Sequence, residues 1–558
     1  MSFTSLFHTF ANLYLDILDM ADRSIEPQVA GPDITAVPIN TNIDDVDASK
    51  HLAGHIDYHG IDTSQVQPGA DAMYEAKISM LNEALIDIGM GHFQWKIFMT
   101  TGFGWFIDQL WMQAVTNIQP PVRHEFGVDR IAFLSVAKYA GLLVGASIWP
   151  MTADFIGRRL AFNVTLLITA VAGLVGAGMP TFPAVATLCA FVGFGSGGNQ
   201  PVDSAIFLEY IPATHQNILV VQSGFWSLGQ VIANMVAWPF IANFSCDSEA
   251  STEECDFESN LGWRYVFWSL GVFTVILFVI RFCFKIYETP KYLLGRGRDE
   301  KVVEVVHKIA ARDGKSTWLS LEHFQAIDAR LASEDSPGVD NNMTVVRKSL
   351  EKFTPSKFKA LFSTPRMALS TSLILFLWMA IGLAFPLYNV FLPMYLQTRG
   401  VQTGSPSLNT TYRNLTIQAL CGLPASFVGG FTVNLRGIGR KGTGCAVCLC
   451  TSLFLFLFTQ AKTQSAVLGF SCGVAFFQNL TLGLLYAYTP ELFPAPIRGT
   501  GNGLAMLFNR SAGLGATLIG AYVGLTTSVP IWISAALFAV AGLVFLVLPY
   551  ESRGRAAS

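Results

Sequence analysis

The sequence is dominated by long apolar stretches, each long enough to cross a lipid bilayer. A membrane-spanning helix needs about 20 predominantly apolar residues. Several stretches reach that length without a charged residue, among them Leu160–Met179, Met367–Thr398, Gly442–Ala461, Gln464–Pro490 and Val529–Pro549. Seven more keep the length but are more polar: 95–118, 131–152, 184–209, 216–241, 264–284, 412–435 and 500–525. The pattern predicts about twelve spans, which must be helices because backbone in lipid has to satisfy its own hydrogen bonds.

The low charge of the chain excludes several other classes of protein. Charged residues make up 13% of it, about half of the roughly 25% usual in soluble domains. The net charge of -3 offers no basic surface for nucleic acid. Cys445, Cys448 and Cys450 lie in an apolar run, which favours small buried hydrophobic side chains over metal ligands. No nucleophile–base pair stands out in the spans, so we expect no enzyme, no metal and no cofactor.

Basic residues in the connections predict the orientation of the spans. Arg158 and Arg159 follow the second span, Arg498 follows the tenth, and the long segment 285–366 is rich in Lys and Arg. Connections rich in Lys and Arg remain in the cytoplasm. This side is therefore predicted to be cytoplasmic, together with both termini.

The opposite side is predicted to face an oxidising exterior, and its loop 243–262 is acidic. Three glycosylation sequons fall on this side, at Asn243, Asn409 and Asn414, and predict a glycoprotein. Cys246 and Cys255 share the acidic loop, where a disulfide would suit such an environment. The sequence leaves open whether that disulfide forms.

The segment 285–366 divides the spans six and six, and the two halves repeat the same motifs. Pro150-Met-Thr-Ala-Asp154-Phe-Ile-Gly157-Arg158-Arg159 follows the second span, and Arg436-Gly-Ile-Gly439-Arg440-Lys441 follows the eighth. Glu209-Tyr-Ile-Pro212 and Glu491-Leu-Phe-Pro494 end the fourth and tenth spans. Duplicated halves are typical of transporters, whose central site opens to either side.

Over about residues 75–550 the sequence resembles the major facilitator superfamily, within it the sugar porters, and most closely the synaptic vesicle glycoprotein and SVOP-like branch. The motifs that carry the resemblance are Tyr486-Ala-Tyr488-Thr489-Pro490-Glu491-Leu-Phe493-Pro494, Ile497-Arg498-Gly499, Gly262-Trp263-Arg264, Glu288-Thr-Pro290-Lys291 and Gly197-Gly198-Asn199-Gln-Pro201-Val-Asp203. The resemblance implies an all-α membrane protein of about twelve transmembrane helices in two six-helix pseudo-symmetric halves. Relatives often carry an Arg in the fourth span where this chain has Cys189.

We expect five segments along the chain. They are a cytoplasmic N-terminal segment (1–90), a first six-helix half (91–284), a cytoplasmic linker with helices (285–366), a second six-helix half (367–549) and a cytoplasmic tail (550–558). Most of the first segment is polar and predicted to be disordered. Its last part, 71–88, predicts an amphipathic helix with Met80, Leu81, Leu85, Ile86 and Ile88 on its apolar face. That helix would lie on the inner leaflet or on the cytoplasmic face of the bundle.

Two carboxyl groups inside the spans are candidates for proton coupling. Asp108 lies midway along the first span and Asp203 lies in the fourth, beside Asn199 and Gln200. Ionisable groups at such depth are costly and are commonly functional. The alternative is that each is a static partner of Lys138 or Arg510.

Substrate contacts and gates are expected from two further groups of residues. Uncharged polar side chains at mid-depth would line the site or join helices: Gln109, Gln113, Gln222, Gln230, Asn234, Tyr388, Asn389, Gln478, Asn479 and Asn509. Charged residues at the cytoplasmic ends would hold the two halves together while the transporter faces outward: Asp154, Arg158, Arg159, Glu209, Arg440, Glu491 and Arg498.

The sequence therefore predicts a secondary active transporter that moves a small organic solute by alternating access. Proton coupling as a symport is favoured, a sugar-transporter-like solute is one option, and a monomer in a lipid bilayer is expected. The alternative is a non-transporting membrane sensor or trafficking glycoprotein on the same fold. The plasma membrane and vacuolar or vesicular membranes fit equally well.

Overall fold

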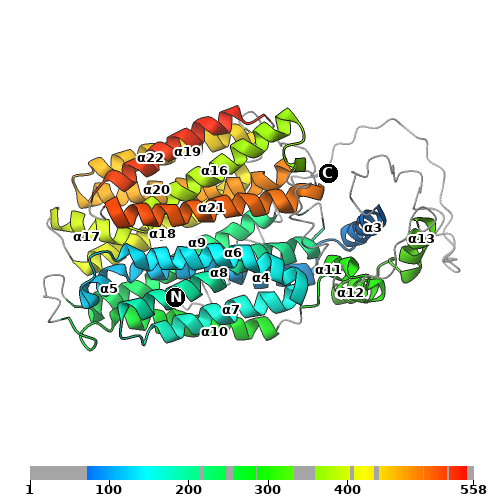
Figure 1. Ribbon diagram of the computed structural model, residues 1–558, viewed down its shortest axis with the longest axis horizontal. Coiled ribbons are helices and arrows are strands. Elements are labelled where there is room, and N and C mark those ends of the chain that lie inside the picture. Colours follow the sequence, from blue (N-terminus) through cyan, green and yellow to red (C-terminus); the bar gives the residue numbers. More distant parts are fainter. Residues whose placement is uncertain are drawn as a thin grey trace. The chain divides into compact units, whose positions relative to one another are not determined.

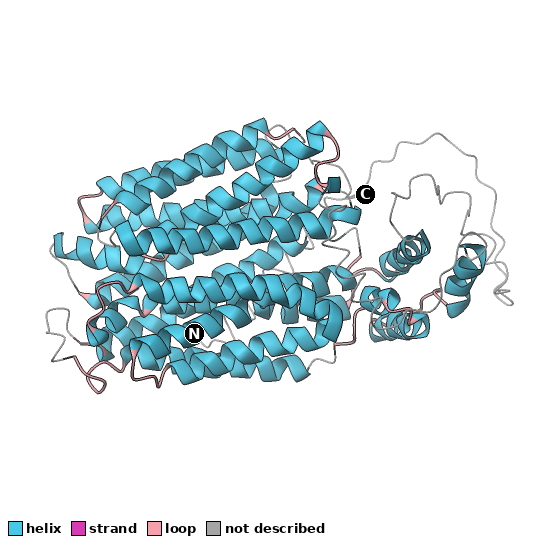
Figure 2. Cartoon of the chain, in the orientation of Figure 1, coloured by secondary structure: helices cyan, strands magenta, loops and turns pink. Residues whose placement is uncertain are grey.

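The computed structural model describes residues 72–212, 215, 218–246, 255–283, 286–331, 359–402, 407–432, 439–493, 495–523 and 527–549. Within these ranges the regular structure is helical, without strands (Figure 2). The first half contains α4 (His92–Asn117), α5 (Gln119–Phe126), α6 (Ala132–Ile156), α7 (Arg158–Gly176), α8 (Phe182–Tyr210), α9 (Ile218–Phe244) and α10 (Gly262–Cys283). The second contains α16 (Pro365–Asn389), α17 (Leu392–Gln402), α18 (Leu408–Thr432), α19 (Gly439–Gln460), α20 (Gln464–Leu492), α21 (Ala495–Val523) and α22 (Val529–Val547).

Apart from the short α5 and α17, the helices of the two halves number twelve, and they are 19 to 29 residues long. Eight of them (α6, α7, α9, α10, α16, α19, α20 and α22) are apolar enough to cross a membrane by length and composition alone. The other four, α4, α8, α18 and α21, are as long but carry more polar residues. In each half the first long helix is followed directly by a short one, so the predicted run Met367–Thr398 is divided at Val390 and Phe391.

Glycines allow two helices of the first half to approach each other closely. A Cβ atom built on Gly141 of α6 would lie 1.9 Å from the Ala190 carbonyl oxygen of α8, and one built on Gly193 of α8 would lie 2.1 Å from that of Lys138. Gly145 and Gly197, one turn further along, make approaches of the same kind. Small residues four apart are the usual means by which membrane helices pack backbone to backbone. The α6–α8 contact therefore fixes where Lys138 lies.

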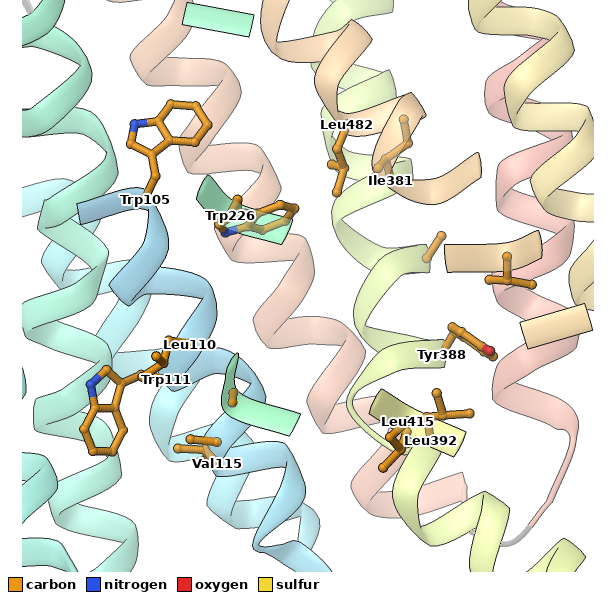
Figure 3. Packing of buried hydrophobic residues seen from close by; sticks show 14 of the residues in the cluster. Trp105, Leu110, Trp111, Val115, Trp226, Ile381, Tyr388, Leu392, Leu415 and Leu482 are labelled. Atoms are coloured by element: carbon orange, nitrogen blue, oxygen red, sulfur yellow. The ribbon is translucent and has the colours of Figure 1, made fainter. Parts of the chain in front are cut away.

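A single cluster of buried hydrophobic side chains extends across both halves. It includes Trp105 and Trp226 of the first half and Ile381 and Leu482 of the second (Figure 3). Exposed apolar side chains such as Val171, Val279 and Leu543 lie on the outside of the same helices. This distribution is typical of a bundle whose periphery contacts lipid.

Four helices outside the bundle gather at the end predicted to face the cytoplasm (Figure 1). They are α3 (Ala72–Ile88), α11 (Pro290–Gly295), α12 (Asp299–Arg312) and α13 (Leu321–Leu331). Lys77 of α3 donates to Asp299 at 2.6 Å and to Asp328 at 2.8 Å. The helix predicted over 71–88 thus packs on the linker helices, and Ile86, assigned to its apolar face, is instead 44% exposed.

The linker is also joined to the first span. The Phe93 N–H, at the start of α4, donates to the Asp313 carboxylate at 3.0 Å, and Lys315 donates to the Ile88 carbonyl. A carboxylate at a helix N-terminus satisfies a free N–H and complements the helix dipole. Movement of α4 is therefore coupled to the linker helices.

Lys77→Met is expected to release α3 from the linker, because two carboxylates lose their shared cation. Burial acts to lower the pKa of Lys77, but Asp299 and Asp328 outweigh it and hold the pKa above the ordinary value. The ammonium is therefore charged at neutral pH and its loss should cost roughly 1–2 kcal/mol locally. Hydrogen exchange of α3 should accelerate about tenfold. Lys308→Met, which removes a pair with Glu304 on the surface of α12, is the control and should leave α3 unchanged.

Candidate functional site

The most polar buried group in the described part of the bundle lies at mid-depth and joins the two halves. We call it the central polar cluster: Asp108 (α4), Lys138 (α6), Gln200 (α8) and Arg510 (α21). Arg510 Nη2 lies 3.4 Å from Asp108 Oδ2 and donates to Gln200 Oε1 at 2.7 Å. Each of the four residues is at most 6% exposed. In this cluster a charge of one half meets an opposite charge of the other.

The hydrogen-bonding capacity of the central polar cluster is only partly used. Asp108 Oδ1, Gln200 Nε2 and both side-chain polar atoms of Asn199 are buried without a partner in the described residues. Lys138 Nζ donates to the Met112 carbonyl at 3.1 Å, and none of its hydrogen bonds goes to a carboxylate in that part of the chain. Buried polar groups usually find partners. The unused donors and acceptor therefore mark a place that can take a ligand.

Aromatic side chains surround this level of the bundle and also cross between the halves. Tyr486 of α20 packs with its ring centroid 5.3 Å from Trp105 of α4 and 4.8 Å from Trp378 of α16. Trp226 of α9 stacks on Phe385 of α16 at 5.8 Å. The indole N–H of Trp226 is buried near Asp108 and makes no geometrically good hydrogen bond in the described part of the chain. Flat apolar surface thus lies next to buried charge.

Asp203, the second candidate for proton coupling, has a different environment. Its Oδ2 accepts from Arg281 Nη2 of α10 at 2.8 Å, and both side chains are fully buried. The Arg281 guanidinium also lies 3.5 Å from the centroid of the Phe162 ring. A Cβ on Gly104 would fall 1.6 Å from Asp203 Oδ2, so only glycine fits there. The partners named from the sequence, Lys138 and Arg510, are therefore wrong for Asp203, whose pair lies entirely within the first half.

Three of the predicted substrate contacts instead join helices toward the end predicted to face outward. Gln113 donates to Asn117, Asn117 donates to Asn234 at 2.8 Å, and Gln230 approaches Gln113 at 3.4 Å. Two further hydrogen bonds reach α18 of the other half: Asn234 donates to the Leu415 carbonyl, and the Tyr412 hydroxyl donates to the Asn117 carbonyl. These bonds hold the halves together at that end.

The remaining predicted contacts are spread over the second half and the inner part of the first. Asn389 donates to Gln478 at 2.9 Å, Asn479 to the Gly422 carbonyl and Asn509 to the Trp378 carbonyl. Gln222 donates to Thr101 at 2.9 Å. Gln109 Oε1 and the Tyr388 hydroxyl are buried without a hydrogen-bond partner among the residues that the structure describes. Of these, Gln109 directly follows Asp108 and Asn509 directly precedes Arg510, so both adjoin the central polar cluster in sequence.

Two of the predicted gate residues form a pair within one half. Arg158 Nη2 lies 2.8 Å from Glu209, and the Arg158 N–H donates to Glu288 of the linker at 2.9 Å. Arg158 and Glu209 both belong to the first half, so this pair does not join the two halves in this conformation; the latch in an outward-facing state stays a prediction. Arg159 is exposed and Arg440 is half-buried. The side chains of Asp154, Glu491 and Arg498 lie outside the described residues.

The end of the first half that is predicted to face outward contains a disulfide and a network of hydrogen bonds to one carboxylate. Cys246 and Cys255 are joined by a disulfide. Arg264 binds the Glu125 carboxylate through both terminal nitrogens, at 2.6 and 2.7 Å, and Trp263 donates to the same carboxylate. The Trp-Arg motif before the sixth span thus anchors α5 to α10.

The three sequons differ in exposure. Asn243 is exposed, and Asn409 is exposed while accepting from Trp238 at 2.6 Å. Asn414 is 5% exposed inside α18, which corrects its assignment as a glycosylation site, because a buried amide has no room for a glycan.

Comparison with known proteins bears on the family and the fold. The sequence profile of the Major Facilitator Superfamily matches residues 97–517. A protein named MFS siderochrome iron transporter 1, from Ceriporiopsis subvermispora, is 44% identical over 87% of this chain and 92% of its own length. The synaptic vesicle 2-related protein of Bos taurus is 25% identical over 85% of this chain and 82% of its own.

A solved structure shows the same fold. The xylose transporter XylE from E. coli superposes with a TM-score of 0.63 at 15% identity, over 83% of this chain and 99% of that chain. The resemblance inferred from the motifs is thereby confirmed, as are the all-α fold and a multi-pass membrane protein. The chain belongs to the major facilitator superfamily of transporters.

Proposed function

We propose that this chain is a secondary active transporter that moves a small organic solute by alternating access, coupled to protons as a symporter. The observation that carries the proposal is the bridge from Arg510 of the second half to Asp108 and Gln200 of the first, at mid-depth. A charge pair between two bodies changes when the bodies rock against each other. A proton or solute that alters the pair therefore biases which way the transporter opens.

Asp108 is the better of the two candidates for the coupling proton. Its carboxylate is 3.4 Å from its cation and has one oxygen without a partner, whereas Asp203 is held at 2.8 Å by Arg281. The Asp203 pair does not cross between the halves, so rocking would leave it intact. We therefore assign Asp203 to structural support and Asp108 to coupling.

The outer end has the contacts that a gate requires. Tyr412, Asn234 and Asn117 join the halves there through two hydrogen bonds to backbone carbonyls. Opening to the outside would break both bonds, and a compensating closure at the inner end would complete the cycle. Asn243 and Asn409 are the proposed sites of glycosylation.

Solute counterflow in proteoliposomes tests transport against a non-transporting sensor. Vesicles loaded with unlabelled solute would receive the labelled solute, taken in turn from a ferric siderochrome, a pentose and small organic acids. The expected result is transient accumulation of at least one solute in vesicles with protein and none in protein-free vesicles. Binding of a solute by the detergent-purified protein without any counterflow would contradict transport and favour the sensor.

A further inference from the structure

The central polar cluster carries more positive than negative charge. Arg510 and Lys138 supply two cations, and Asp108 is the one carboxylate near them in the described residues. Asp203 does not balance the excess because Arg281 already pairs with it. An isolated buried cation is costly unless an anion or several hydrogen bonds compensate it. Lys138, at 1% exposure, has a backbone carbonyl as its hydrogen-bond acceptor.

The hydrogen bonds of the cluster show the same imbalance. Among the four side chains of the cluster, the unused donors are the amide of Gln200 and the remaining N–H groups of Lys138, against one unused acceptor, Asp108 Oδ1; Asn199 adds one unused donor and one unused acceptor. The indole N–H of Trp226, which makes no geometrically good hydrogen bond within the described residues, lies near the Asp108 carboxyl group. A ligand that fills this place must bring acceptor oxygens. A carboxylate brings two, in the planar form that a guanidinium binds best.

We propose that the central polar cluster binds the carboxylate of a small organic acid between Arg510 and Lys138, with the acid's apolar body against Trp226 and Tyr486. The inference rests on the proposed transport function and names its substrate class. The aromatic surface next to the cations favours a flat or cyclic acid. Gln200 donates to the second carboxylate oxygen.

Proton coupling then follows from competition for Arg510. The titratable groups that face Asp108 are Arg510 from α21, Lys138 and Tyr139 from α6 and Tyr486 from α20, while α8 presents the neutral Gln200 and α9 presents Trp226. Asp108 and a substrate carboxylate cannot both use the guanidinium without repelling each other. A proton on Asp108 neutralises its carboxylate, which then no longer competes for the Arg510 guanidinium. The proton and the acid therefore bind together.

In this scheme the net charge of the site is the same with and without bound ligand. Without a ligand the cluster holds one negative and two positive charges. With a proton on Asp108 and the acid's carboxylate bound, it again holds one negative and two positive charges. The loaded and empty carriers have the same charge, so the transport of a monocarboxylate with one proton is electroneutral.

Lys138 supplies a buried cation near the position in the fourth span where relatives often carry an arginine. Cys189, at the position where relatives often carry that arginine, is fully buried on α8 and lies next to Lys138. The close α6–α8 contact brings a cation from the neighbouring helix to the same place. We therefore assign Lys138 as a substrate-binding residue.

Thermal-shift titration of the full chain in detergent tests the inference with matched acids and amides: benzoate with benzamide, nicotinate with nicotinamide, and cyclohexanecarboxylate with its amide. At least one acid should raise the melting temperature at pH 6, and its amide should not. Lys138→Met should weaken binding of that acid roughly 10–100-fold, the cost of losing a charge-assisted hydrogen bond. Lys96→Met, at an exposed position of α4, is the matched control and should bind as the wild type does.

The pH dependence separates binding from a mere effect on folding. Acid binding to the wild type should weaken as pH rises, whereas Asp108→Asn should bind the acid equally well at pH 6 and pH 8. Any of three results would overturn the inference: amides that bind as tightly as the acids, no acid that raises the melting temperature, or unchanged acid affinity in Lys138→Met. Acid binding without counterflow would contradict transport but not the carboxylate site. Counterflow of neutral solutes alone would support transport and contradict the carboxylate site.

Discussion

Arg281→Met is expected to lower the free energy of unfolding by about 3–5 kcal/mol, because it leaves the fully buried Asp203 carboxylate without its cation. The guanidinium also donates to the Phe162 carbonyl and covers the Phe162 ring, so packing is lost as well. The measurement is the melting temperature of detergent-purified protein, together with the fraction that elutes as a single species.

A double variant removes both charges of the Asp203–Arg281 ion pair. Asp203→Asn combined with Arg281→Met should recover most of the loss, since replacing both members of a buried pair is often close to neutral. Arg159→Met, at an exposed position, is the control for loss of an arginine. If the double variant were as unstable as the single one, Arg281 would act through packing and not through Asp203. If the recovered double variant still concentrates solute with protons, Asp203 is structural, as we propose.

Gly193→Ala is expected to be nearly as damaging, although it adds one methyl group. The new Cβ would lie 2.1 Å from the Lys138 carbonyl oxygen and 3.0 Å from the Leu142 nitrogen, which are backbone atoms that cannot rotate away. The helices α6 and α8 would have to separate, at a cost of about 1–3 kcal/mol or more. Because Lys138 moves with α6, acid binding should weaken along with stability.

Gly515→Ala is the matched control for that prediction. Gly515 lies on α21, and nothing in the described residues is within 4 Å of the position of its Cβ. Alanine there should leave the melting temperature unchanged or raise it, because alanine costs less conformational entropy in a helix than glycine does. Equal loss in both glycine variants would mean that glycine flexibility matters more than the close contact between α6 and α8.

Hydrophobicity and length were enough to predict the helices, since a span needs a fixed length of apolar residues whatever its partners. The limits of that signal are visible in α4, α8, α18 and α21, which fall short on apolar character but match the other spans in length. Three of them carry Asp108, Gln200 and Arg510. The polarity that weakens the span signal is the same polarity that builds the central site.

The partners of buried charges could not be predicted in the same way. Asp203 and Arg281 are 78 positions apart, and Glu125 and Arg264 are 139 apart. Which side chains meet depends on how each helix is rotated about its axis, and no local pattern encodes that rotation. Arg281 was overlooked because it lies near the end of a span, where basic residues usually signal topology.

The central site was partly predictable. Asp108 stood out as a carboxyl group inside a span, and Arg510 and Lys138 stood out as its candidate partners. The sequence could not show that Arg510 reaches across to Gln200, or that Lys138 lies beside Cys189 through a glycine contact. Gln113, Gln230 and Asn234 were chosen for their polarity, and polarity alone does not distinguish a ligand contact from a bond between helices.

Proton-driven accumulation in sealed proteoliposomes tests the central claim most directly. An acid exterior and an alkaline interior would be imposed, and uptake of the solute that shows counterflow would be followed beyond equilibrium, with protein-free vesicles to subtract passive entry. The wild type should concentrate the solute only while the pH gradient lasts, and Asp108→Asn should exchange the solute but no longer concentrate it. Accumulation that persists in Asp108→Asn, or a wild type that only equilibrates the solute, would contradict the account.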